Sequence, residues 1–335
     1  MSKQKIICID GISGQLGSYF TEEYLKKDFK VFGLKRRSSS FNTERIDHLM
    51  ENHNLKLVYG DLADYGSLLS FVEQTKPDYY IHAGFMSMVR VSFDIPEYTM
   101  DTGATGTVRV LEALRHASPE TRFLNLASSE MLGGNSPPQN EESPHYPCSI
   151  YGVAKSASFF ATKNYREAYD MFACSAINFN SESPRRGETF LPRKVTRAAT
   201  RIKLGLQNKL DLGNLAAERD WQHSLDAVRA MMLILETDIP DDYAIGTGEM
   251  HSVKEFVEMV FSKLELVWKE YVKIDPRFYR PTEVDSLRCD DSKFRKAFPQ
   301  FVRQYSFESM VDEMIECDMK LAKKELMIKN HMENT

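Results

Sequence analysis

Cysteine is scarce in this 335-residue chain, and none of its five cysteines belongs to a CxxC pair. This spacing argues against a disulfide framework and against a zinc site, so we predict reduced thiols, no bound metal and a cytoplasmic location. Long hydrophobic runs are missing as well. No stretch approaches the ~20 apolar residues of a membrane span, and the apolar run after the N-terminus is too short for a signal peptide.

An excess of basic residues is also lacking, because the formal net charge is −5. General binding to nucleic acid or to an acidic membrane surface is therefore not expected, whereas a local basic pocket for one phosphorylated ligand is compatible with this balance. The 42% hydrophobic and 27% charged residues are typical of a globular protein with a buried core.

Short apolar runs alternate with helical patterns through the first half of the sequence. Runs typical of buried strands lie at residues 6–9, 30–34, 55–59, 79–82, 122–126 and 175–179. Helical patterns of about 10 or more residues separate them, the first at 14–27. This alternation predicts an α/β fold with a Rossmann-type, doubly wound parallel sheet.

The second half is less regular. Helical patterns lie near 192–206, 222–236, 252–264 and 307–325, strand-like pieces at 209–212 and 242–245, and the last ten residues predict a helix end or a loose tail. A smaller α/β substrate-binding domain is expected. Because no Gly/Ser- or Pro-rich linker separates the halves, we predict interleaved domains. These are 1–178 with about 214–248 for a cofactor, and about 179–213 with 249–335 for the substrate.

A glycine-rich turn follows the first predicted strand and opens the first predicted helix. Gly11, Gly14 and Gly17 have GxxGxxG spacing, in which glycines let the backbone approach a pyrophosphate at the helix N-terminus. With Ser13 and Gln15 between them, this turn is the candidate dinucleotide site. Taken alone, the same spacing also fits a plain tight turn.

The second strand ends without the acid that NAD-preferring sites use to bind ribose hydroxyls. Arg36 and Ser38 stand there instead, and a guanidinium and a hydroxyl suit the 2′-phosphate of NADP. We predict NADP, with NAD as the open alternative; a solvated basic loop would also explain these residues. Asp61 and Leu62 follow the third strand, where Asp61 either meets the adenine or caps the next helix.

The candidate catalytic pair is Tyr151 and Lys155, in a YxxxK motif. Their spacing of four puts both side chains on one helix face. An ammonium beside the phenol is expected to lower the pKa of Tyr151, so that it acts as a base at neutral pH. Ser128 ends the fifth strand, at the sheet edge that faces the ligand crevice, where its hydroxyl would hold a substrate oxygen.

Glu130 stands two residues after this serine. Hydride transfer alone does not need a carboxylate at this place. Removing a proton beside a carbonyl, or protonating a leaving hydroxyl, does need one. Glu130 is therefore predicted to be a second acid–base group, the alternative being an exposed glutamate that opens a helix.

Five segments then resemble one family. They lie at residues 35–48, 180–190, 212–214, 219–221 and 275–284. Their residues resemble GDP-mannose 4,6-dehydratases, which belong to the extended short-chain dehydrogenase/reductase superfamily. The resemblance runs over roughly residues 3–325, and its most specific parts are residues 38–47 and 182–190.

The resemblance implies a lyase of nucleotide-sugar metabolism that takes part in deoxysugar biosynthesis. GDP-mannose, or a close GDP-sugar, would be oxidised at C4 with NADP+, lose water across C5 and C6 with help from Glu130, and regain the hydride at C6. It also implies a homodimer or homotetramer in which the basic, Ser-rich loop reaches a neighbour's cofactor site. The implied GDP-sugar contacts are Asn180, Arg186, Lys194, Arg219, Arg280 and Glu283.

Some positions depart from the family pattern. Two of its histidines are replaced by Met88 and Ser181 near the cofactor and the sugar. These losses motivate an alternative, an enzyme on another GDP-sugar such as a GDP-heptose that works as a 4-dehydrogenase or epimerase without eliminating water. A non-catalytic, cofactor-sensing protein is a third hypothesis, against which the intact Glu130, Tyr151 and Lys155 argue.

Overall fold

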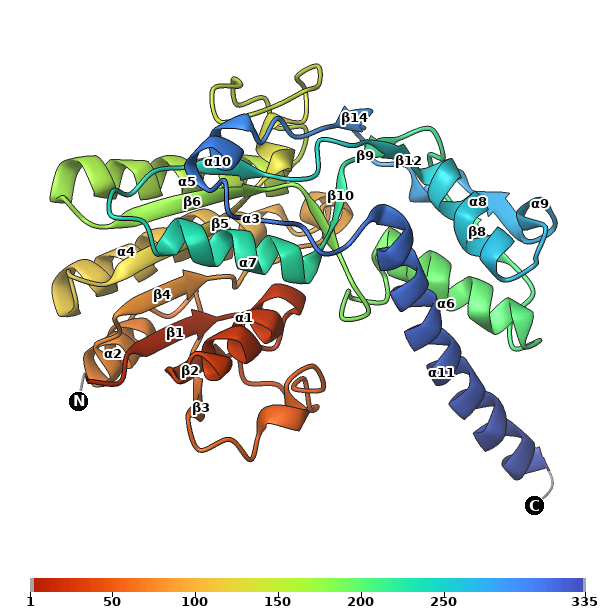
Figure 1. The fold of residues 1–335 in the computed structure, drawn as a ribbon, viewed down its shortest axis with the longest axis horizontal. Helices are drawn as coiled ribbons and strands as arrows, with labels where there is room; N and C mark the ends of the chain where they lie inside the picture. The colour runs from red at the N-terminus through yellow and green to blue at the C-terminus, as the bar shows by residue number, and fades with distance from the viewer. Residues whose placement is uncertain (1–2, 334–335) are drawn as a thin grey trace.

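Seven parallel strands form the central sheet of the computed structural model, which describes residues 3–333 (Figure 1). In spatial order they are β3 (Leu55–Tyr59), β2 (Lys30–Lys35), β1 (Ile6–Asp10), β4 (Tyr79–His82), β5 (Arg122–Ser128), β6 (Ala173–Asn178) and β11 (Tyr243–Ile245). The central strands are buried almost throughout, as expected for short apolar runs covered on both faces. The predicted doubly wound sheet is confirmed, and the strand-like piece at 242–245 is its edge strand β11.

Helices cover both faces of the sheet (Figure 1). On one face, α1 (Gln15–Lys26) packs against α7 (Ser224–Leu235), and their apolar sides form one core with β1, β4, β5 and β6. On the other face lie α2 (Tyr65–Thr75), α4 (Gly106–Ala117) and α5 (Ile150–Tyr169). Short helical elements connect them: η1 (Asp47–Leu49), η2 (Arg90–Phe93), α3 (Pro96–Met100), a π-helical turn η3 (Asp101–Thr105) and η4 (Ser129–Leu132).

A second lobe carries the substrate-side segments and has its own apolar core. Its helices are α6 (Leu191–Lys203), α8 (Val253–Lys263), α9 (Trp268–Tyr271), η5 (Pro276–Phe278) and α11 (Phe307–Glu333). Its short strands are β7 (Asn180–Glu182) with β10 (Trp221–His223), β8 (Leu210–Leu212) with β13 (Val272–Ile274), and β9 (Glu218–Arg219) between β12 (His251–Ser252) and β14 (Ser286–Leu287).

The chain passes between the two lobes several times. After α7 and β11 have returned to the sheet, α10 (Ser292–Ala297) places Phe294 in the core that α1 and α7 share, with Phe298 beside it. The last helix, α11, then packs on α6 and runs away from the sheet (Figure 1). It is longer than the predicted 307–325, because no glycine or proline interrupts the sequence up to Glu333.

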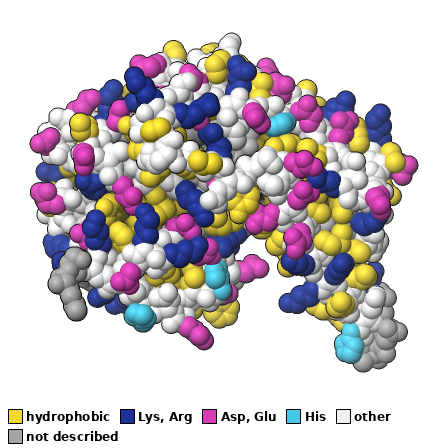
Figure 2. All heavy atoms as spheres, viewed as in Figure 1, with side chains coloured by type: hydrophobic (Ala, Val, Ile, Leu, Met, Phe, Trp, Pro, Cys, Tyr) yellow, Lys and Arg dark blue, Asp and Glu magenta, His cyan; other side chains and the backbone are white. Residues whose placement is uncertain are grey.

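Over residues 3–333, no helix is long and apolar enough to cross a membrane. Within the same residues, no cluster of three or more His, Cys, Asp or Glu side chains has an arrangement that could hold a metal ion. All five cysteines are free thiols. Figure 2 shows acidic and basic side chains intermixed over one face, which is hollowed between α11 and the sheet body.

Candidate active site

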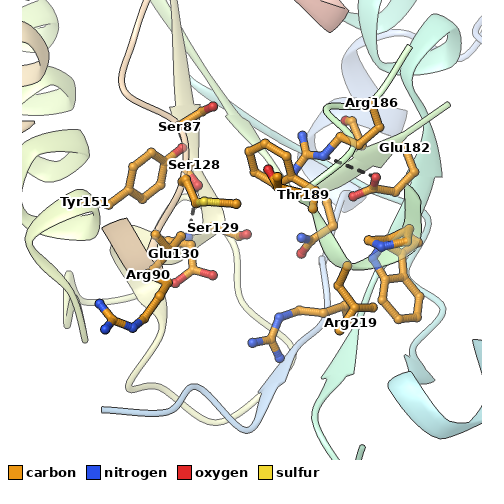
Figure 3. A pocket seen from close by; sticks show the side chains of 18 of the residues that line it. Ser87, Arg90, Ser128, Ser129, Glu130, Tyr151, Glu182, Arg186, Thr189 and Arg219 are labelled. Carbon is orange, nitrogen blue, oxygen red and sulfur yellow. Dashed lines mark hydrogen bonds and ion pairs between the residues drawn. The ribbon is translucent and has the colours of Figure 1, made fainter. Parts of the chain in front are cut away.

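A cleft of about 740 Å³ opens at the carboxyl ends of the strands, between the sheet and the second lobe. One wall comes from the end of β5, the start of α5 and the segment after β4, and the other from β7, α6 and the turns around residues 212–219 and 277–283. All predicted catalytic and substrate-binding residues line it: Ser128, Glu130, Tyr151, Lys155, Asn180, Arg186, Lys194, Arg219, Arg280 and Glu283. The structure therefore brings together residues that are far apart in the sequence (Figure 3).

Tyr151 and Lys155 lie in the first two turns of α5, whose start is capped by Ser149 accepting from the Gly152 N–H at 3.0 Å. The Tyr151 ring packs edge-on against Phe85, with 5.0 Å between ring centroids. Lys155 Nζ lies 4.2 Å from the centroid of the same Phe85 ring and donates to the Leu126 carbonyl at 2.6 Å. The expected shared helix face is confirmed, with Phe85 as the common contact.

The predicted lowering of the Tyr151 pKa is wrong for this structure. Burial raises the pKa of Tyr151 to about 12, and a hydrogen bond with Ser128 opposes this rise only in part. Burial also lowers the pKa of Lys155 to about 8, against the opposing charge of Asp10. The reason is burial, which disfavours the charged form of both groups; the charge of Glu130 raises the pKa of Tyr151 further.

Glu130 lies in the helical turn that follows β5 and is only 7% exposed. Its backbone N–H donates to Ser128 Oγ at 3.3 Å, which orients the Ser128 hydroxyl at the start of this turn. Glu130 Oε1 is 3.3 Å from Arg280 Nη1, while the buried Oε2 has no hydrogen-bond partner among the described residues. The alternative of an exposed glutamate at a helix start is therefore wrong.

The opposite wall is rich in cations held by backbone carbonyls or aromatic rings. Arg219 is 7% exposed and donates to the Glu218 carbonyl at 2.7 Å. Lys194 donates to the Asp211 carbonyl at 2.6 Å, and its Nζ lies 3.7 Å from the Phe278 ring centroid. Burial lowers the pKa of both cations. Preformed cations of this kind suit an anionic ligand such as a diphosphate.

The other predicted substrate contacts complete this wall. The Glu283 carboxylate accepts from the Arg280 N–H at 2.7 Å, which fixes the backbone that presents Arg280. Asn180 begins β7 and has a buried Oδ1 without a hydrogen-bond partner among the described residues. An unsatisfied acceptor in a cleft wall is available for a ligand donor.

The glycine turn connects β1 with α1 and fits a pyrophosphate. Gly11 has φ +65°, and a Cβ there would come within 2.7 Å of the Gly84 backbone nitrogen. A Cβ on Gly17 would collide with the Gly11 carbonyl. Gly14 is the N-cap of α1 and has no side chain to cap it, so the first N–H groups of the helix stay available to an anion.

The remaining predicted cofactor residues lie outside the cleft, near the turn and the ends of β2 and β3. Gln15 bridges to the second lobe by donating to the Ser181 carbonyl at 2.9 Å, and Arg36 Nη1 donates to the Tyr98 hydroxyl at 2.5 Å. Ser38 lies two residues further on in the same loop, with its Oγ 3.2 Å from Ser40 Oγ.

The helix-cap alternative for Asp61 is wrong, because Asp64 caps α2 by accepting from the Gly66 N–H at 3.1 Å. Asp61 instead accepts from the Ala63 N–H at 3.0 Å, in the turn where Leu62 is buried. Ser13 contributes its carbonyl, which faces the Arg45 guanidinium at 3.4 Å. Arg45 is thus a cation at the glycine turn that sequence reasoning missed.

Two further groups of the site were also missed. Phe85 follows β4 at the carboxyl edge of the sheet, and the rule that ligands bind at this edge was a signal that would have found it. Glu182 lies inside a segment that the sequence singled out, yet its charge was not considered. Figure 3 shows Glu182 and Arg186 on the wall opposite Tyr151 and Ser128.

Comparison with known proteins gives a consistent result. The sequence profile described as "GDP-mannose 4,6 dehydratase" matches residues 8–314. The chain is 48% identical over 332 residues to GDP-mannose 4,6 dehydratase 2 of Arabidopsis thaliana, covering 96% of this chain and 89% of the relative. It is 41% identical over 344 residues to the Homo sapiens GDP-mannose 4,6 dehydratase, and the alignment covers 95% of this chain and 92% of the relative.

Solved structures share the fold. The Thermus thermophilus UDP-glucose 4-epimerase in complex with NAD superimposes with a TM-score of 0.82 at 20% identity, over 93% of this chain and 98% of that one. The Streptomyces venezuelae dTDP-glucose 4,6-dehydratase DesIV superimposes with a TM-score of 0.83 at 21% identity, over 94% and 97%. At these identities the likeness establishes the architecture alone.

Proposed function

The chain belongs to the GDP-mannose 4,6-dehydratase family, and we propose that its cleft converts GDP-mannose, or a close GDP-sugar, to the GDP-4-keto-6-deoxy sugar. The protein is an enzyme, a sugar-nucleotide 4,6-dehydratase of the lyase type. The observation that carries the proposal is the cleft itself. On one wall lie a hydroxyl, a carboxyl and a phenol, those of Ser128, Glu130 and Tyr151, and on the opposite wall lie arginines and a lysine.

Tyr151 starts the reaction in this proposal. Its phenolate removes the proton of the sugar's C4 hydroxyl, and the Ser128 hydroxyl holds the same oxygen. The Lys155 ammonium stabilises the phenolate form of Tyr151, which is the form that acts as a base. A bound nicotinamide cofactor would supply the hydride chemistry of the cycle, oxidation at C4 and later reduction at C6. Burial raises the pKa of Tyr151 to about 12. Deprotonation of Tyr151 therefore depends on the positive charge that is added when the site is filled.

Glu130 carries the elimination. A ketone at C4 makes the C5 proton acidic, and the unpartnered Glu130 Oε2 takes it. The C6 hydroxyl then leaves as water, with Glu130 returning the proton or Ser128 assisting. When the hydride is added at C6, C5 takes up a proton, which balances the one that Tyr151 removed from the C4 hydroxyl and leaves Tyr151 ready for the next turnover. Arg280, 3.3 Å from Oε1, keeps the carboxylate oriented during both transfers.

The GDP moiety is bound by the cationic wall. Arg186, Lys194, Arg219 and Arg280 supply charge-assisted hydrogen bonds to the diphosphate and ribose side, and Asn180 and Glu283 complete the contacts. Backbone carbonyls and aromatic rings already hold several of these cations, so little side-chain entropy is lost on binding.

NADP is the proposed cofactor. Gly11, Ser13, Gly14, Gln15 and Gly17 form the pyrophosphate turn, Asp61 and Leu62 face the adenine, and Arg36 with Ser38 binds the 2′-phosphate. The support for NADP over NAD is the exposed, basic end of β2, which lacks an acid.

The assembly and location are proposals as well. We propose a homodimer or homotetramer of a cytoplasmic protein, supported by the fully exposed Phe41 in the basic loop and by the free cysteines. We also propose the domain division of 1–178 with about 214–248, and about 179–213 with 249–335, although α10 packs on the first core and Trp221 of β10 on the second. Light scattering after gel filtration measures the mass, and a monomer would contradict this assembly.

The test of the function is direct. Purified protein is incubated with GDP-mannose and NADP+, and the product is followed by NMR together with the absorbance of the reduced cofactor. A GDP-4-keto-6-deoxy sugar formed without net cofactor reduction is expected. Net accumulation of reduced cofactor with retained C6 hydroxyl would instead identify a 4-dehydrogenase, and no conversion would exclude GDP-mannose as the substrate.

A further inference from the structure

Glu182 is a buried carboxyl in the wall of the cleft, and the proposed mechanism does not use it. It ends β7, its side chain is 1% exposed, and its Oε2 has no hydrogen-bond partner among the described residues. Within residues 3–333, the carboxylate forms one ion pair, with Arg186, whose Nε lies 3.3 Å from Oε2 (Figure 3). A carboxylate in this position loses most of its hydration and has one compensating charge.

Arg186 is held in place from two further sides. Its guanidinium carbon lies 3.8 Å from the Phe190 ring centroid, and its backbone N–H donates to the Ser183 carbonyl at 3.0 Å. The ion pair with Glu182 and the Phe190 ring thus contact the guanidinium, and both Arg186 and Glu182 line the cleft. An anion that binds to Arg186 comes close to the Glu182 carboxylate, which repels it.

Charged groups on the elements around β7 are engaged with partners of their own. His223, which faces Glu182 in the β7–β10 register, has its Nε2 2.8 Å from Glu313 of α11. On the other sides, Arg193 of α6 pairs with Asp318 of α11, and Arg185 pairs with Glu22 of α1. Arg186 is the charge that acts on Glu182, and burial outweighs it, raising the pKa of Glu182 to about 7.

We propose that Glu182 takes up a proton when the diphosphate of a nucleotide sugar binds to Arg186, so that substrate binding is coupled to protonation. The proton comes from solvent and goes to a carboxylate oxygen; no bond of the substrate changes. The inference rests on the proposed GDP-sugar site, because the diphosphate is the group that competes for Arg186. Protonation removes the repulsion and leaves the whole charge of Arg186 to the ligand.

The coupling has a definite sign. With a pKa near 7, Glu182 is about 90% ionised at pH 8 and about 10% ionised at pH 6. Binding is therefore accompanied by uptake of close to one proton at pH 8 and by almost none at pH 6. The same linkage predicts that affinity weakens above pH 7, approaching tenfold per pH unit.

Isothermal titration of GDP-mannose into the protein loaded with NADP+ tests this, with Tyr151→Phe as the background so that no turnover heat is released. The diphosphate of GDP-mannose is a diester and does not titrate between pH 6 and 8. Heats measured at pH 8 in two buffers with different ionisation enthalpies give the number of protons taken up. About 0.7–0.9 proton is expected at pH 8, and less than about 0.2 at pH 6.

Two variants identify the carboxyl. Glu182→Gln on the same background should bind with no proton uptake and with an affinity that no longer changes between pH 7 and 8. Glu188→Gln, which alters a 62% exposed carboxylate paired with Arg197, should keep the uptake. If Glu182→Gln does not fold, Lys155→Met on the same background takes its place: uptake at pH 8 that survives this change supports Glu182, and uptake lost with Lys155 overturns the inference.

The failures are distinguishable. GDP-mannose that binds with equal heats in both buffers at pH 8 contradicts the proton coupling and leaves the substrate proposal standing. Uptake that persists in Glu182→Gln assigns the proton to another group, such as Lys155, and also overturns the inference. Absence of binding overturns both the inference and the proposed substrate.

Discussion

Arg280 Nη1 lies 3.3 Å from Glu130 Oε1, a pairing between residues 150 apart in the sequence and from opposite walls of the cleft. One oxygen of the candidate acid–base group is thus held by a cation, and the other, Oε2, is buried with no hydrogen-bond partner in the described part of the chain. A carboxylate held in this way presents one defined oxygen to a substrate proton. Elimination chemistry needs such a fixed base, whereas hydride transfer does not.

Glu130→Gln is expected to separate the two halves of the reaction. The amide cannot take the C5 proton, so overall turnover should fall by roughly 10²–10⁴-fold. Oxidation at C4 by Tyr151 should continue, and reduced cofactor should accumulate up to one equivalent per site in a single-turnover absorbance experiment. As a control, Glu265→Gln changes an 88% exposed carboxylate that pairs with Lys203 outside the cleft, and it should behave as the wild type. Loss of cofactor reduction in Glu130→Gln would contradict this division of roles.

Much of the fold follows from local sequence patterns. Short apolar runs that alternate with helical patterns are typical of buried parallel strands, so the doubly wound sheet could be predicted, whereas the order of its strands was not. The YxxxK pair and Ser128 were found because their positions are defined by one helix and one strand. The substrate contacts depended on family resemblance, since no local rule places Arg219 and Arg280 in one cleft.

The predictions that were wrong concern properties that depend on burial and on contacts between segments far apart in the sequence. Burial raises the pKa of Tyr151 and lowers that of Lys155, and the degree of burial is set by Phe85 and the second lobe rather than by the YxxxK spacing. Asp61 was assigned as a possible cap although Asp64, three residues later, has the extended backbone that a cap needs. Neither property is encoded within a single element.

Lys155→Met is expected to produce a more stable but inactive protein. In the wild type, the Lys155 pKa is lowered from 10.5 to about 8, so below pH 8 the folded state retains a poorly solvated ammonium that the unfolded chain solvates freely. Removing this charge, less the lost hydrogen bond to Leu126, should raise the free energy of unfolding at pH 7 by about 2 kcal/mol. Turnover should fall by at least about 100-fold.

Urea unfolding at several pH values checks the sign. The folded pKa of Lys155 is below the unfolded value, so wild-type stability should rise as pH increases from 8 toward 10.5, and the advantage of Lys155→Met should shrink over the same window. A difference that is constant with pH, or a variant less stable than the wild type at pH 7, would show that Lys155 is not destabilised by burial.

The pair of Asp10 and His82 ties the cofactor turn to the helices behind the sheet. Asp10 Oδ2 is 2.6 Å from His82 Nδ1 and accepts from Tyr80 Oη at 3.1 Å, and His82 Nε2 is 2.9 Å from Thr107 Oγ1 of α4. Both partners of the pair are at most 2% exposed. Asp10→Asn and His82→Gln should each lower the free energy of unfolding by about 3–5 kcal/mol, because each leaves a buried polar group without its partner.

A double-mutant cycle distinguishes this pair from two independent packing defects. The double variant Asp10→Asn/His82→Gln should lose less stability than the sum of the single variants, by at least about 1 kcal/mol, since the second change removes a group already left unpaired. Thr107→Val removes the hydroxyl that contacts His82 Nε2. Its effect on the free energy of unfolding should likewise be less than additive with that of His82→Gln. Strictly additive losses would rule out an energetically coupled network.

Arg36→Ala is expected to change the cofactor preference. Arg36 lies at the exposed end of β2, and its guanidinium is held by the Tyr98 hydroxyl at 2.5 Å rather than by a carboxylate, so its charge remains available to a 2′-phosphate. A charge-assisted contact of this type contributes about 1.5–3 kcal/mol, so the Kd for NADP+ should rise by roughly 10–100-fold while that for NAD+ changes less than about twofold. Fluorescence titration of both cofactors measures the ratio.

Tyr98→Phe, which releases the guanidinium without removing it, should weaken NADP+ binding in the same direction but less. Equal losses for the two cofactors would mean that Arg36 supports the loop and does not read the phosphate.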